Sequence, residues 1–311
     1  MPDNSIKGIV LATIGTINLV KANEKIYECK VQGKLVSHYK KSSIVAVGDK
    51  VDFILTDEKF DSNNNLEKGT IIKIGERFTR LSRISPKNKH NEHVLASNID
   101  NLLIFCSAAD PFYNKRLIDR YLISAIAGGL NPIIVINKCE LMDNEIIFED
   151  LIIYNELGID VFFISIYQNI GLNELSKRLE SEKTVITGAS GVGKSTYVNF
   201  LLGSEEQAIG SISESTAKGQ HTTSFVRMFE VANNTYLIDT PGIREFALYG
   251  INKHELPTYF IDFLKFHNNC KFAPCSHTHE PKCAVKEALE RGELDFDRYE
   301  SYLMILDSLE K

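Results

Sequence analysis

The first 76 residues carry short apolar runs that turn-prone residues separate. The runs cover residues 8–12, 26–31 and 51–55, and the separators are Gly33, Gly48 and the polar cluster at 61–65. No apolar period typical of a helix extends through this region. Short strands with this spacing predict a small β-barrel or sandwich over residues 1–76.

From about residue 98, apolar strand patterns alternate with amphipathic helical patterns. The predicted strands are residues 102–106, 132–136, 161–164, 184–187 and 236–238, and the predicted helices are 114–127, 145–156, 172–180 and 196–202. This alternation predicts an α/β domain over residues 98–249, with a parallel sheet and helices on both faces. Ligands of such sheets bind beyond the carboxyl ends of the strands. Residues 77–97 are predicted to be a linker.

The strand pattern ends at about residue 250. A cysteine-rich loop follows, and then two helical stretches, residues 284–291 and 297–310, which Gly292 separates. Residues 250–311 are therefore predicted to form a small α-helical domain.

Composition and charge refine this three-part organisation. The 311 residues suffice for two or three domains, and 43% hydrophobic with 24% charged residues is typical of a soluble globular protein. Residues 1–95 hold 16 Lys and Arg against 11 Asp and Glu, whereas the rest of the chain holds 19 against 30. The basic first third predicts contact with a polyanion and favours a five-stranded oligonucleotide-binding barrel (OB-fold). A solvated charge imbalance without a partner is the alternative.

Neither a membrane span nor a leader is expected. No run approaches the about 18 apolar residues of a spanning helix, and the N-terminus lacks the basic and apolar regions of a signal peptide. We therefore expect a cytoplasmic protein with no membrane partner.

A phosphate-binding loop follows the predicted strand 184–187. It fits G-x-x-x-x-G-K-[ST], and its predicted nucleotide contacts are Gly188, Ala189, Ser190, Gly191, Val192, Gly193, Lys194, Ser195 and Thr196. Glycines let successive backbone N–H groups point at phosphate oxygens, and the following helix adds its positive N-terminal end. Lys194 is expected to reach the β- and γ-phosphates, and the Ser195 hydroxyl to bind Mg²⁺.

Two further segments suit the same phosphate site. Asp239 ends the strand 236–238 and starts D-x-P-G, so its carboxylate is expected to hold Mg²⁺ through water and the Gly242 N–H to contact the γ-phosphate. The long polar segment 204–224 ends in His221, Thr222 and Thr223. One threonine is predicted to be a second Mg²⁺ ligand, and His221 is either catalytic or a solvated loop histidine.

A candidate guanine-reading motif lies upstream of this loop. In Asn137-Lys138-x-Glu140, the carboxylate is expected to accept from the ring N–H and the exocyclic amine, and the lysine to lie along the base. Glu140 replaces the usual aspartate, which leaves an ATPase as an alternative. Ser165, after the strand 161–164, is the candidate residue of a supporting base loop.

The order of these motifs is unusual. Ordinary GTPases run phosphate loop, switch, D-x-x-G, base motif and base support, whereas here the base motif and its support come first. This order indicates a circularly permuted P-loop GTPase domain in which D-x-P-G leads into the C-terminal domain. Ile243 occupies the position where a water-orienting glutamine is common, so we expect slow hydrolysis that depends on a partner or on His221.

A metal-ligating pattern lies in the cysteine-rich loop. Cys270-x₄-Cys275-x-His277-x₅-Cys283 offers three thiolates and one imidazole, the ligands of a closed, structural zinc site. His279 is a competing fourth ligand.

Taken together, these motifs resemble the small-ribosomal-subunit-dependent GTPase A family (RsgA, also called YjeQ) over essentially the whole length. The residues that carry the resemblance are 137–140, 188–195, 219–223, 239–246, the Cys/His set and Arg77-x-x-x-Leu81-x-Arg83. The resemblance implies an OB-fold, a permuted GTPase domain and a zinc module, with GTP hydrolysis stimulated by the small (30S) subunit late in its assembly. It also implies a catalytic role for His221. Glu140, Gln220 and Ser224 depart from the family pattern.

The leading hypothesis is therefore a Mg²⁺-dependent enzyme that converts GTP to GDP and phosphate, is released from 16S rRNA on hydrolysis, and acts as a monomer. The assigned catalytic residues are His221, Lys194, Thr222 and Thr223. An RNA-binding factor for which the nucleotide is only a ligand switch is the non-enzymatic alternative.

Overall fold

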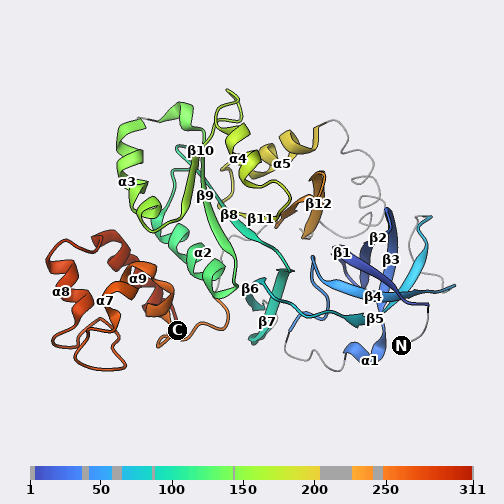
Figure 1. Cartoon of the computed structure of the whole chain (residues 1–311), viewed down its shortest axis with the longest axis horizontal. Coiled ribbons are helices and arrows are strands. Elements are labelled where there is room, and N and C mark those ends of the chain that lie inside the picture. Colours follow the sequence, from blue (N-terminus) through green and yellow to red (C-terminus); the bar gives the residue numbers. More distant parts are fainter. Residues whose placement is uncertain are drawn as a thin grey trace.

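The computed structural model describes residues 4–36, 42–57, 65–85, 88–142, 144–203, 226–240 and 248–309. Three parts follow one another along its long axis: a barrel near the N-terminus, a sheet flanked by helices, and a helical part near the C-terminus (Figure 1). In the described part of the chain, no helix is long and apolar enough to cross a lipid bilayer.

The barrel has five strands, as predicted. They are β1 (Ile6–Ile14), β2 (Ile17–Ala22), β3 (Lys25–Val31), β4 (Lys50–Leu55) and β5 (Lys68–Ile74), and the short helix α1 (Gly33–Val36) follows β3. Their order is β1-β2-β3-β5-β4, and pairing of β1 with β4 closes the sheet. Val20, Phe53 and Ile71 fill the interior and are fully buried. Closure leaves no long unpaired strand edge in the barrel.

The segment predicted as a linker contains a β-hairpin. Residues 80–97 form β6 (Arg80–Ser85) and β7 (Asn88–Ser97), which pair antiparallel. The barrel holds it through Asp49, whose buried carboxylate accepts two hydrogen bonds of 2.7 Å from Arg77 and one of 2.6 Å from the Ser97 hydroxyl. The hairpin's polar residues give little strand pattern, and these distant partners stabilise it instead.

The central sheet is mostly parallel. It contains β8 (Asn101–Ser107), β9 (Asn131–Asn137), β10 (Asp160–Phe163), β11 (Lys183–Thr187), β12 (Arg227–Ala232) and β13 (Thr235–Asp239). The order is β10-β9-β8-β11-β13-β12, in which only β12 runs antiparallel to its neighbour within this part. Beyond β12 the sheet continues into the barrel, because Ala12 of β1 pairs with Arg227.

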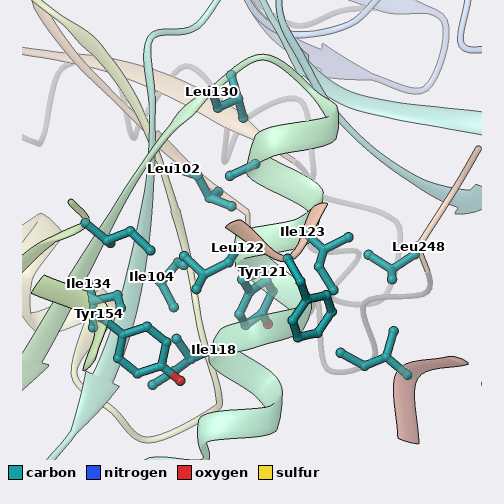
Figure 2. Packing of buried hydrophobic residues seen from close by; sticks show 14 of the residues in the cluster. Leu102, Ile104, Ile118, Tyr121, Leu122, Ile123, Leu130, Ile134, Tyr154 and Leu248 are labelled. Carbon is teal, nitrogen blue, oxygen red and sulfur yellow. The ribbon is translucent and has the colours of Figure 1, made fainter. Parts of the chain in front are cut away.

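Helices cover both faces of this sheet, as predicted. One face packs against α2 (Lys115–Ala127) and α3 (Asn144–Glu156), and the other against α4 (Leu172–Arg178) and α5 (Lys194–Leu202). Alternation along β8 sends Leu102 and Ile104 toward α2 and Phe105 toward α5. Figure 2 shows Leu102 and Ile104 packed against Ile118 and Leu122 of α2.

The C-terminal part contains only helices among the residues that the structure describes. They are η3 (Leu256–Tyr259), η4 (Ile261–Phe263), α7 (Leu264–His267), α8 (Ala284–Glu290) and α9 (Phe296–Leu309). Arg298 of α9 is buried between two carboxylates, Asp119 of α2 and Asp262 of η4, with 2.8 Å from Nη2 to Asp262 Oδ1. Burial favours the neutral guanidine, but the carboxylates outweigh it and raise the pKa of Arg298.

Replacing Arg298 by Met should destabilise the protein by about 3–5 kcal/mol, because Asp119 and Asp262 would remain buried without their cation. Calorimetric unfolding measures the effect as a fall in Tm. Arg291→Met removes an arginine from an exposed pair with Glu293 and should leave Tm nearly unchanged. Equal Tm values for wild type and Arg298→Met would contradict the assigned role.

Candidate nucleotide-binding site and metal centre

The phosphate loop joins β11 to α5 and requires glycine at two close approaches. Gly188 has φ +144°, and a Cβ there would lie 2.0 Å from the carbonyl oxygen of Phe105. Gly193 has φ +103°, and a Cβ there would lie 2.3 Å from Nδ2 of Asn137. No other residue fits these positions. The loop is thus pressed against β8 and β9 while α5 begins at Lys194.

Lys194 begins α5 after the loop that follows β11, and Asp239 ends the neighbouring strand β13. The Lys194 ammonium donates to the carbonyl oxygens of Gly188 (2.9 Å) and Ala189 (2.6 Å). Burial lowers the pKa of Lys194, and the nearby Asp239 carboxylate opposes this shift. Burial likewise raises the pKa of Asp239, against the field of Lys194. The charges of Lys194 and Asp239 therefore stabilise each other. Ser195 and Thr196 are exposed in the first turn of α5.

The predicted base motif lies against the phosphate loop. Asn137 ends β9, is buried, and donates from Nδ2 to the carbonyl oxygen of Val192 at 3.0 Å. Lys138 has a left-handed backbone, and its ammonium donates to the carbonyl oxygens of Ala109 and Asp110 in the loop after β8. The base motif and the phosphate loop, about fifty residues apart in the chain, are therefore in direct contact.

Glu140 lies in the short helix η1 (Cys139–Leu141) and carries an unsatisfied acceptor. Its Oε2 atom is buried and has no hydrogen-bond partner among the described residues. A buried carboxylate oxygen without a donor is costly. A ligand with adjacent N–H donors, such as the ring N–H and exocyclic amine of guanine, would satisfy it.

Ser165 shapes the loop after β10. Its hydroxyl accepts from the Gln168 N–H at 3.0 Å, and its backbone exchanges two hydrogen bonds with Ile170. The preceding residue, Ile164, accepts from the Cys139 N–H at 3.1 Å. Ser165 is therefore brought next to the base motif, as its predicted supporting role requires.

Several predicted site residues lie outside the described residues. They are His221, Thr222, Thr223 and Gly242, together with Gln220, Ser224 and Ile243. Their roles stay predictions.

The cysteine-rich loop gathers the four predicted metal ligands. The ligand atoms of Cys270, Cys275, His277 and Cys283 all lie within 4.8 Å of one another. The Cys270 and Cys283 sulfurs are 3.9 Å apart, and His277 Nδ1 lies 3.6 Å and 3.3 Å from them. Tetrahedral zinc requires S···S and S···N separations of about 3.8 Å and about 3.6 Å. The donor set and its spacing therefore fit zinc.

A second histidine orients the imidazole of this cluster. His267 Nδ1 lies 3.0 Å from His277 Nε2, which leaves Nδ1 of His277 facing the sulfurs. Burial lowers the pKa of His277 to about 4, so its ring is in the neutral form that binds metals. The competing candidate, His279, is exposed, and its Nδ1 contacts the Thr278 hydroxyl at 2.9 Å instead.

The sequence motifs did not identify two kinds of group that contribute to the sites. His267 was outside the Cys/His spacing, although it precedes Cys270 by only three positions. The carbonyl oxygens that hold Lys138 belong to Ala109 and Asp110, and a backbone group carries no residue-type signal.

Gly193→Ala should weaken binding of a fluorescent GTP analogue by about tenfold, because the new methyl displaces the Asn137 amide and leaves it buried without its acceptor. Gly203→Ala is the matched control, since Gly203 also has positive φ but open space around its Cα. Loss of affinity in both variants, or in neither, would show that the Asn137 contact is not responsible.

His267→Ala should lower zinc affinity by about 10- to 100-fold, because the ring that orients His277 is lost. Chelator competition with the purified protein measures this affinity. His279→Ala should leave it unchanged, since His279 is not part of the ligand cluster. A larger loss in His279→Ala than in His267→Ala would reverse the assignment.

Comparison with known proteins agrees with this geometry. The chain matches the family models of the RsgA GTPase over residues 74–249 and of the RsgA N-terminal domain over residues 7–60. It is 39% identical to the small ribosomal subunit biogenesis GTPase RsgA of Chlorobaculum parvum, covering 99% of this chain and 100% of that protein. The corresponding protein of Flavobacterium psychrophilum is 37% identical, covering 96% and 92%.

Solved structures show the same arrangement over the whole length. YjeQ from Thermotoga maritima superposes with a TM-score of 0.74 at 27% identity, covering 98% of each chain. YloQ, described as a circularly permuted GTPase, gives 0.72 at 26% identity, covering 99% of this chain and 96% of that one. The family models and the relatives of more than 30% identity over nearly the whole length show that the chain belongs to the RsgA GTPase family.

Proposed function

We propose that this GTPase acts in late maturation of the small (30S) ribosomal subunit in the cytoplasm, binding 16S rRNA as a monomer and leaving it on hydrolysis. One observation carries the choice of guanine nucleotide. The unpartnered, buried Oε2 of Glu140 lies in a motif whose Asn137 is bonded to the phosphate loop. The names of the relatives, small ribosomal subunit biogenesis GTPases, support the subunit as partner.

The chain supplies positioning and charge for phosphoryl transfer. The Lys194 ammonium donates to the carbonyl oxygens of the loop, which are neutral acceptors. Phosphate oxygens would accept stronger, charge-assisted hydrogen bonds from the same ammonium. Ser195 would hold Mg²⁺ directly and Asp239 through water. When bound, the ion neutralises the charge that develops on the phosphate oxygens. Little covalent chemistry is required of the protein.

The attacking water needs a group to orient it. Ile243 has no polar atom in its side chain, so we assign this task to His221, with Thr222 or Thr223 as a further Mg²⁺ ligand. The same deficiency makes intrinsic turnover slow. A group or an ordering effect supplied by the subunit would then raise the rate.

Zinc would be structural. Cys270, Cys275, His277 and Cys283 offer four protein ligands, which leaves no open coordination position for a substrate. The Tyr299 hydroxyl donates to the His277 carbonyl oxygen at 2.7 Å, so the ligand loop is also tied to α9. Metal binding would thus stabilise the helical domain.

Purified small subunits should raise GTP turnover by about a hundredfold, the effect of one positioned charge-stabilising group. Phosphate release with and without subunits measures it, and Lys194→Ala serves as the inactive control. Subunit binding that is intact but leaves phosphate release unstimulated would show that the nucleotide is only a switch ligand.

A further inference from the structure

Helix α3 carries exposed apolar side chains in addition to its buried stripe. Ile147, Leu151 and Tyr154 form its inner stripe and are buried against the sheet and α2. Phe148 and Ile152 lie one turn apart outside this stripe and are 50% and 40% exposed. A helix that covers a sheet from one side normally presents a polar outer face. Covering the sheet therefore does not explain the exposed apolar side chains of α3.

Neighbouring residues enlarge this group into a surface. Leu141 and Ile146 are 58% and 65% exposed, and the Phe148 ring lies 6.3 Å from that of Phe163 on the edge strand β10. We call the set Leu141, Glu145, Ile146, Phe148, Glu149, Ile152 and Glu156 the α3 outer face. Single exposed apolar residues are ordinary, but a group of them on neighbouring elements is typical of an interaction site.

The charge of this surface is of one sign. Residues 139–160 contain seven Asp and Glu and no Lys or Arg. Lys115 and Arg178 neutralise two of these acids, Asp150 and Asp160. Glu145, Glu149 and Glu156 are exposed and have no ion-pair partner in the part of the chain that the structure describes. They occupy the same helical stripe as Phe148 and Ile152, at spacings of three and four residues.

We propose that the α3 outer face docks a basic protein segment that carries apolar side chains, presented by the small ribosomal subunit. The inference rests on the proposed function for the source of that segment. RNA phosphate would be repelled by the unpaired glutamates, and a second copy of this chain would bring acid against acid. Lysine and arginine combine an apolar stem with a charged head, so they can contact both the apolar side chains and the glutamates of the α3 outer face.

The α3 outer face adjoins the predicted base contact. Leu141 directly follows Glu140, the predicted base contact, within η1. In Figure 1, α3 lies at the outer edge of the central sheet, and the barrel lies at the other end of the molecule. The basic first third of the chain (residues 1–95) and the acidic α3 outer face would then meet different chemistries of one large partner, RNA at one end and protein at the other.

Phe148→Gln/Ile152→Gln should weaken binding to purified small subunits, in the presence of a non-hydrolysable GTP analogue, by about tenfold or more. Glu145→Gln/Glu149→Gln should weaken it about threefold or more, because attraction to a basic segment is lost. Both variants should retain wild-type Tm and intrinsic GTP turnover.

Glu174→Gln/Glu180→Gln is the matched control, since it removes the same charge from exposed residues in and just after α4, on the other face of the sheet. It should bind like the wild type. Tighter binding by Glu145→Gln/Glu149→Gln would identify RNA as the occupant and overturn the proposal, as would unchanged binding by both α3 variants. Failure of the wild type itself to bind would overturn the proposed function as well, so the two failures are distinguishable.

A photo-crosslinker in place of Ile152 identifies the occupant directly. The expected adduct on the small subunit survives ribonuclease, is destroyed by protease, and maps to a Lys- and Arg-rich segment. An adduct destroyed by ribonuclease, a crosslinked dimer of this chain, or no adduct above that of a crosslinker at Glu174 would each contradict the proposal.

Discussion

Parallel pairing of β9, β8, β11 and β13 is the constraint on which the site depends. Because the carboxyl ends of parallel strands meet at one edge, the base motif after β9 and the phosphate loop after β11 are neighbours whatever their order in the chain. The hydrogen bond from Asn137 to Val192 and the close approach of Gly193 then join them. Circular permutation changes which segments enter and leave this edge, and leaves the edge itself intact.

The permutation also decides what the sheet is attached to. β12 continues into the barrel through its pairing with β1, and Lys21 of β2 forms an ion pair with Glu230 of β12. On the other side, Arg298 joins α9 to the buried carboxylate of Asp119 in α2 and to that of Asp262 in η4. The central sheet is thus joined to the barrel by strand pairing and an ion pair, and to the helical part by a buried ion-pair cluster.

Two surfaces of opposite character follow from this arrangement. Residues 1–95, which include the barrel and the strands β6 and β7, hold more Lys and Arg than Asp and Glu, whereas the outer side of α3 is acidic and apolar. A polyanion and a basic protein segment cannot exchange places on them, because each would meet charge of its own sign. Electrostatic complementarity at the two ends would orient the molecule on a partner that offers both.

Local pattern alone determined the element types, the three-part organisation, the phosphate loop and the Cys/His set, because glycine spacing, apolar period and ligand type are properties of short segments. Tertiary structure decided the rest. It selected His277 over His279, added His267, left Glu140 Oε2 without a donor and stabilised the hairpin at 80–97 through Asp49. It also exposed Phe148 and Ile152, which the sequence cannot distinguish from the buried side of α3. Each of these depends on which groups the folded chain brings into contact, and residue spacing alone does not determine that.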